Sequence, residues 1–107
     1  MENEAVKVND QFKIIFSIVK EISEDSIPHA SDYGISNEKF VDLVEIAQEA
    51  NLIKNVKVLR TGNGVHSLII DKAKVTFGGL QYLHDNSPLM RTYKGLKEVK
   101  EWIPFVY

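Results

Sequence analysis

Apolar residues between positions 9 and 23 recur with the spacing of one helix face. The face consists of Phe12, Ile15, Phe16, Val19 and Ile22. This spacing predicts a helix over the range, with Asn9 or Asp10 as its cap. Ile14 and Ile18 widen the apolar stripe, so we expect this helix to be covered on two sides and to lie centrally in the core.

A second helix is predicted after a connection over residues 24–34. The connection contains Pro28 and Gly34 and has no sustained period, so we expect it to hold one short turn or strand. Ser36 or Asn37 can cap the helix, which should run to about Asn51. Its buried face would be formed by Phe40, Leu43, Val44, Ala47 and Ala50.

A hairpin is predicted in the middle of the chain. Two β-prone runs, Lys57–Arg60 and Val65–Ile70, flank the segment Thr61–Gly64. An Asn-Gly pair between such runs is a strong short-range signal for a hairpin turn. We therefore expect a two-stranded wing.

The last third begins with Thr76, which can cap a short helix ending near Asp85. Gly79 lies three residues further on, where another element can press close. Ser87 caps a last helix over about residues 88–103. The order of elements predicts one α+β domain over residues 1–107, a winged helix-turn-helix with a two-stranded wing and an additional C-terminal helix.

The same third also carries a family resemblance. Its motif is Val75-Thr76-x-x-Gly79-x-x-Tyr82-Leu83, then Asn86-Ser87, then Tyr93-Lys94-x-Leu96-Lys97-Glu98-Val99-Lys100-Glu101-Trp102-Ile103. This pattern resembles the YjcQ family, small proteins of Gram-positive bacteria and their prophages, whereas residues 1–75 match mainly in the order of elements. The resemblance implies a winged-helix-like fold and a phage or prophage context. The family brings no established activity, so no functional residue is carried over.

Composition indicates an ordinary globular protein. Of 107 residues, 44% are hydrophobic and 26% are charged. No apolar run reaches the roughly 18 residues that a membrane span needs, and the first residues lack the order of a signal peptide, so we expect a cytoplasmic protein without a membrane partner. The absence of cysteine excludes disulfides and thiolate chemistry.

Charge is distributed unevenly along the chain. Residues 1–50 hold four Lys and eleven Asp or Glu, whereas residues 51–107 hold nine Lys or Arg and four acidic residues. An anionic partner should therefore contact the second half. We expect double-stranded DNA, bound by a phage or bacterial transcriptional regulator. The predicted contacts are Lys57, Arg60, Lys72 and Lys74 to phosphates, Asn63 and His66 at the wing tip, and Asn37, Lys39 and Gln48 toward bases.

The second helix provides an argument against DNA. Its exposed positions carry Lys39 against Glu38, Asp42, Glu45 and Glu49, and a phosphate backbone repels such a face. The alternative is a winged-helix protein-protein interaction module without DNA binding. The hairpin lysines would then be solvated charges that discourage extension of the sheet.

The predicted last helix carries an apolar stripe, formed by Leu89, Tyr93, Leu96, Val99 and Ile103. One interpretation is that the stripe packs on the first helix and completes the core. The other is a two-fold dimer seam, because part of the spacing follows a heptad.

No motif predicts catalysis or a bound cofactor. His29, His66 and His84 lie on separate elements, without the close spacing that forms a metal site. The chain has neither a Gly-x-Ser-x-Gly elbow nor a dinucleotide-binding turn. We therefore expect a non-enzymatic binding protein with no metal, no cofactor and no small-molecule substrate.

Overall fold

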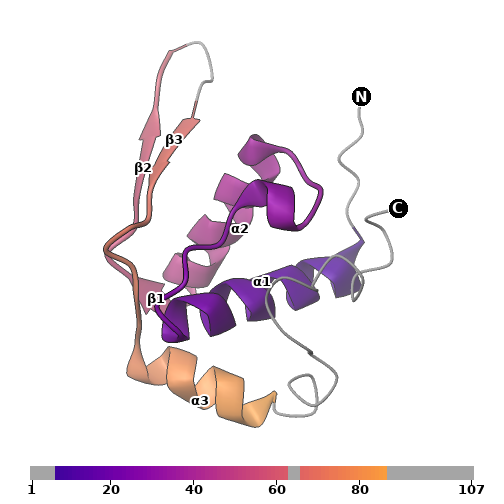
Figure 1. The fold of residues 1–107 in the computed structure, drawn as a ribbon, viewed down its shortest axis with the longest axis vertical. Helices are drawn as coiled ribbons and strands as arrows, with labels where there is room; N and C mark the ends of the chain where they lie inside the picture. The colour runs from indigo at the N-terminus through magenta and orange to yellow at the C-terminus, as the bar shows by residue number, and fades with distance from the viewer. Residues whose placement is uncertain (1–6, 63–65, 87–107) are drawn as a thin grey trace.

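The computed structural model describes residues 7–62 and 66–86 as a mixed α+β fold of winged-helix-like element order (Figure 1). Helices α1 and α2 pack together, a hairpin rises beside α2, and α3 lies against α1. The predicted α+β class is confirmed, whereas the predicted C-terminal helix lies outside the described residues. The elements in order are α1 (Val8–Ser23), η1 (Ala30–Asp32), α2 (Asn37–Glu49), β1 (Ile53–Lys54), β2 (Lys57–Arg60), β3 (His66–Ile69), β4 (Lys74–Val75) and α3 (Phe77–Asp85).

Helix α1 is the centre of the core, as its wide apolar stripe predicts. Ile14 and Ile18 are fully buried, and α2, β4 and α3 all contact this helix. Phe12 is 60% exposed, so its predicted burial is wrong. Phe16 and Val19, four and seven residues further along the same face, are fully buried, so the predicted face is buried from Phe16 onward and exposed at Phe12.

The start of α1 also differs from the prediction. The helix begins at Val8, and its N-cap, Lys7, makes no side-chain capping bond. Asn9 and Asp10 therefore lie inside the helix, and their predicted capping role is wrong. Asp10 lies in the first turn, where the helix dipole favours a carboxylate.

Helix α2 begins as predicted, because the Ser36 hydroxyl accepts a 3.0 Å bond from the Lys39 backbone N–H. Its predicted face is buried except for Ala50, which is exposed because the helix ends at Glu49. The predicted turn in the preceding connection is η1. Just after it, Tyr33 is fully buried, stacks on Phe40 and shares a 2.9 Å hydrogen bond with the Ser17 hydroxyl.

The hairpin is confirmed, and a second two-stranded ladder lies next to it. Strands β2 and β3 are antiparallel with Arg60 opposite His66, and β1 and β4 form a second two-stranded ladder with Ile53 opposite Val75. The ladder of β1 with β4 was not predicted. Residues 55–56 on one side and 70–73 on the other interrupt the pairing, so the two ladders stand in different registers. Asn63 and Gly64 of the predicted turn lie outside the described residues.

Thr76 and Gly79 perform the roles that the sequence predicts. The Thr76 hydroxyl accepts a 2.9 Å bond from the Gly79 N–H and donates to the Asn51 carbonyl. A Cβ on Gly79 would lie 2.1 Å from the Leu52 carbonyl oxygen, so only glycine allows this approach. The start of α3 is thereby fixed against the segment that leads into β1.

Candidate interaction surfaces

The outer face of the hairpin combines lysines with exposed apolar side chains. Side chains alternate between the two faces of a strand, so Lys57 and Leu59 point to the face opposite Val58 and Arg60. Lys57 pairs with Ile69, and Leu59 lies diagonally across from Ile69. Leu59 is 51% and Ile69 is 42% exposed. We call the set Asn55, Lys57, Leu59, Ile69 and Lys72 the hairpin patch. All of its members except Leu59 line one shallow hollow, together with Val56.

Neither lysine of the hairpin patch has an ion pair among the described residues. Lys74, on β4, lies 4.0 Å from Asp25, and both side chains are well exposed. The hairpin patch therefore presents two lysines, neither paired with a described residue, next to the exposed side chains of Leu59 and Ile69.

Helix α2 carries the opposite charge on its solvent face. We call the set Glu38, Asp42, Glu45, Ile46 and Glu49 the acidic stripe; its members are spaced to lie along one side of the helix. Ile46 is 45% exposed in the middle of the stripe. The acidic stripe thus also includes an exposed apolar side chain.

Arg60 belongs to this acidic environment and not to the hairpin patch. Both of its Nη atoms donate to the Glu45 carboxylate, at 2.9 and 2.5 Å. The pKa of Arg60 is raised above its usual value, chiefly by the hydrogen bond with Glu45, and the charges of Asp42 and Glu49 add to the effect. This arginine is bound bidentately by the protein's own carboxylate, the geometry that a phosphate would otherwise use.

Gln48 is occupied by the backbone of the hairpin. Its amide oxygen accepts the Val56 N–H at 2.9 Å, and its amide nitrogen donates to the Val56 carbonyl at 3.0 Å. Val56 lies where the two ladders lose register, so Gln48 satisfies the backbone groups that no strand partner meets. A base contact from Gln48 would break both bonds.

The other predicted DNA-contacting residues are dispersed. Asn37 is exposed in the first turn of α2, and Lys39 is half-buried about two turns before Ile46, the centre of the acidic stripe. The His66 backbone pairs with Arg60. Asn63 lies outside the described residues, as do the seam residues Leu89, Tyr93, Leu96, Val99 and Ile103, and their roles stay predictions.

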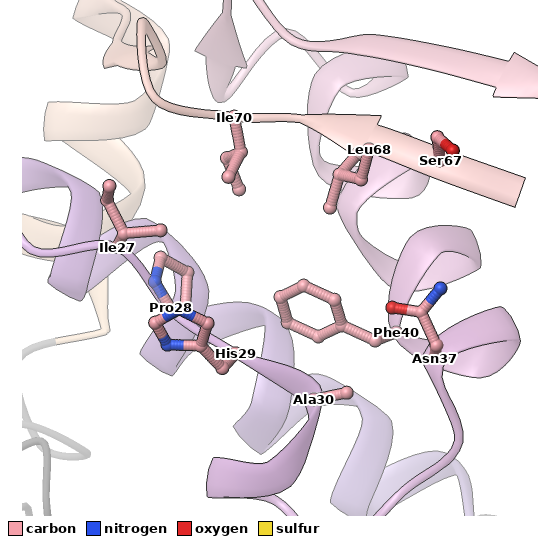
Figure 2. Close-up of a pocket in the computed structure, with 9 residues that line it drawn as sticks. All are labelled: Ile27, Pro28, His29, Ala30, Asn37, Phe40, Ser67, Leu68 and Ile70. Atoms are coloured by element: carbon pink, nitrogen blue, oxygen red, sulfur yellow. The ribbon is translucent and has the colours of Figure 1, made fainter.

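A cleft of about 420 Å³ opens between β3, the N-terminal end of α2 and the connection before η1. Figure 2 shows Phe40 pointing into the cleft, with Pro28 on one side and Leu68 on the other. His29 and Asn37 supply polar groups, and of the residues that line the cleft His29 alone is titratable. The lining is mainly apolar and brings no set of acid, base and nucleophile together. Across residues 7–62 and 66–86, no three His, Asp or Glu side chains are grouped to hold a metal ion.

One buried carboxyl group was not anticipated from the sequence. Glu21 on α1 is 4% exposed, and its Oε2 has no hydrogen-bond partner within the described part of the chain. The pKa of Glu21 is raised to about 7, chiefly by burial and additionally by the nearby charges of Asp32 and Glu24. Its burial could have been predicted from its spacing: Glu21 follows Ile18 by three residues and Ser17 by four, which places it on the buried arc of the helix.

Together these features define a small α+β protein with a winged-helix-like order of elements and two oppositely charged surfaces. None of its described helices is long and apolar enough to cross a membrane. The chain belongs to the YjcQ protein family, whose model matches residues 12–102. It is similar to the uncharacterized protein YjcQ of Bacillus subtilis (strain 168), with 29% identity over 92 residues that cover 85% of this chain and 95% of that protein. No solved structure matches the chain. The resemblance to this family is confirmed.

Proposed function

We propose that this chain is a non-enzymatic, cytoplasmic protein-protein interaction module built on a winged-helix-like scaffold. The observation that carries the proposal is the acidic stripe of α2, the helix that would enter a DNA major groove in such a scaffold. Its carboxylates would face phosphates and repel them. A protein surface with basic and apolar side chains is the complementary partner for this helix.

The hairpin patch supports the same conclusion. Leu59 and Ile69 are exposed within it, and exposed aliphatic groups lose their contact with water most effectively against another protein surface. Arg60, the cation best suited to bind a phosphate bidentately, is occupied by Glu45. The hairpin therefore offers a DNA backbone fewer cations than its sequence suggests.

A second candidate is a transcriptional regulator of phage or bacterial origin that binds duplex DNA through the wing alone. The observation that favours it is the outward position of Lys57 and Lys72, which have no ion pair among the described residues. Each phosphate contact would contribute to a steep salt dependence of binding.

One experiment separates the two candidates. Purified protein is titrated with random duplex DNA at low and moderate salt. The variant Lys57→Glu is compared with Lys7→Glu, which makes the same charge change at the exposed residue just before α1. We expect neither salt-sensitive binding nor a difference between the variants. Salt-sensitive binding that only Lys57→Glu weakens would refute the protein-interaction proposal and support the wing-led regulator.

In a parallel assay, a photo-crosslinking amino acid replaces Leu59 in cells, with a control at exposed Ser31. We expect protein adducts from position 59 that position 31 does not give. Equal adduct patterns from the two positions would remove the support for the hairpin patch.

A further inference from the structure

The hairpin patch and the acidic stripe are complementary to each other. One carries Lys57 and Lys72 around exposed Leu59 and Ile69, and the other carries carboxylates around exposed Ile46. Protein surfaces that associate commonly pair an apolar centre with opposite charges at the rim. The chain therefore contains both halves of one contact.

A single copy does not close this contact on itself. Figure 2 shows Leu68 of β3 and Ile70, just after the strand, at the cleft beside α2. Ile69, which lies between them in the sequence, is on the opposite face of the strand. The hairpin patch is therefore turned away from the helix that carries the acidic stripe. The two surfaces need two molecules to meet.

We propose that the hairpin patch of one copy binds the acidic stripe of a second copy, head to tail. This inference rests on the proposed protein-interaction function and names a second copy of this chain as the partner. A two-fold pairing of either surface with itself is disfavoured, because it would set Lys57 and Lys72 against the same lysines, or the carboxylates of α2 against the same carboxylates. Opposite charges meet only where the hairpin patch of one copy faces the acidic stripe of another.

The head-to-tail arrangement has two physical consequences. Each copy that binds leaves one hairpin patch and one acidic stripe open at the ends, so the contact extends into a chain of molecules unless the rotation closes a ring. Its charged rim is exposed to solvent, so added salt screens it and weakens association.

Charge exchange tests the proposal. The hairpin variant carries Lys57→Glu with Lys72→Glu, and the stripe variant carries Asp42→Lys with Glu49→Lys; Glu45 is left in place because it binds Arg60. Average mass is measured against protein concentration by sedimentation at low and high salt. For the unchanged protein we expect a mass that rises with concentration and falls toward the monomer in high salt. Each variant alone should associate on the order of tenfold more weakly, because attractions at the rim become repulsions.

The decisive observation is rescue. A mixture of the two variants, and a single chain with all four substitutions, should associate again, since in both cases a patch of one charge can meet a stripe of the opposite charge on another molecule. Circular dichroism of each variant shows that it is folded. A monomer at every concentration, or variants that stay monomeric when mixed, would overturn the head-to-tail contact. That result would leave the proposed function standing if position 59 still gives adducts with a different protein, whereas salt-sensitive DNA binding lost in the hairpin variant would overturn both.

Discussion

The buried carboxyl of Glu21 predicts a defined dependence of stability on pH. In the folded protein its pKa is raised from 4.5 to about 7, first by burial and then by Asp32 and Glu24. In the unfolded chain the group returns to its ordinary value. Between these two pKa values the folded state holds a proton that the unfolded state has released. The free energy of unfolding therefore falls as pH rises through this window.

The magnitude follows from the size of the shift. A shift from 4.5 to about 7 at about 1.4 kcal/mol per pH unit corresponds to about 3 kcal/mol. This contribution is zero below pH 4.5, where both states are protonated, and is complete above about 7, where both are ionised. A loss of this size is a large part of the stability of a domain of this length.

The variant Glu21→Gln removes the ionisation and keeps a polar side chain of similar shape. Urea unfolding is measured from acid to mildly alkaline pH for the unchanged protein, for Glu21→Gln and for Glu38→Gln, a control at an exposed position. Relative to the unchanged protein, Glu21→Gln should gain up to about 3 kcal/mol as pH rises from 4.5 to above 7. Glu38→Gln should follow the unchanged protein. Parallel curves for Glu21→Gln and the unchanged protein would refute the reasoning.

Two further predictions concern contacts that fix the hairpin and α3, each measured by chemical denaturation. Gly79→Ala should destabilise the protein by about 1–3 kcal/mol, because the added Cβ would lie 2.1 Å from the Leu52 carbonyl oxygen. The control Gly78→Ala should have little effect, because its closest contact is 3.1 Å and a gain of up to about 1 kcal/mol in helix propensity offsets the strain. Equal effects of the two substitutions would contradict the close approach at Gly79. Gln48→Ala should cost about 1–3 kcal/mol and speed hydrogen exchange of the Val56 amide, since it leaves two backbone groups unpaired; unchanged exchange would show that water replaces the side chain.

Local signals in the sequence predicted a helix start well where a side chain bonds to a particular backbone N–H of the first turn. Ser36 and Thr76 each precede a helix whose third residue supplies the N–H they accept, so the start of both helices is determined within a few residues. The close approach at Gly79 was also predictable, because a glycine in the first turn of a helix lets another element come close to the backbone. The start of α1 lacked such a signal, and its cap was wrongly assigned.

Contacts between elements were not predictable in this way. The pair Arg60–Glu45 joins residues 15 apart on a strand and a helix. Gln48 bonds to the backbone of Val56, where the two ladders are interrupted, and no sequence pattern predicts that interruption. Alternation along the strand also limits the predicted phosphate contacts. Lys57 and Arg60 are three residues apart on one strand, so alternation places them on opposite faces, and they cannot serve one phosphate surface together.

The contacts of α2 with the hairpin matter for function because they fix the angle between the two proposed surfaces. An exposed ion pair such as Arg60–Glu45 contributes little stability, about 0–1 kcal/mol, so its effect on folding is small. With the two bonds from Gln48 to Val56, however, it holds the strand and the helix at one orientation. A head-to-tail contact repeats whatever angle separates its two surfaces, so a fixed angle produces a regular chain or ring and a variable angle produces irregular association. The same bonds that withdraw Arg60 and Gln48 from DNA would thus give an assembly of this protein its defined geometry.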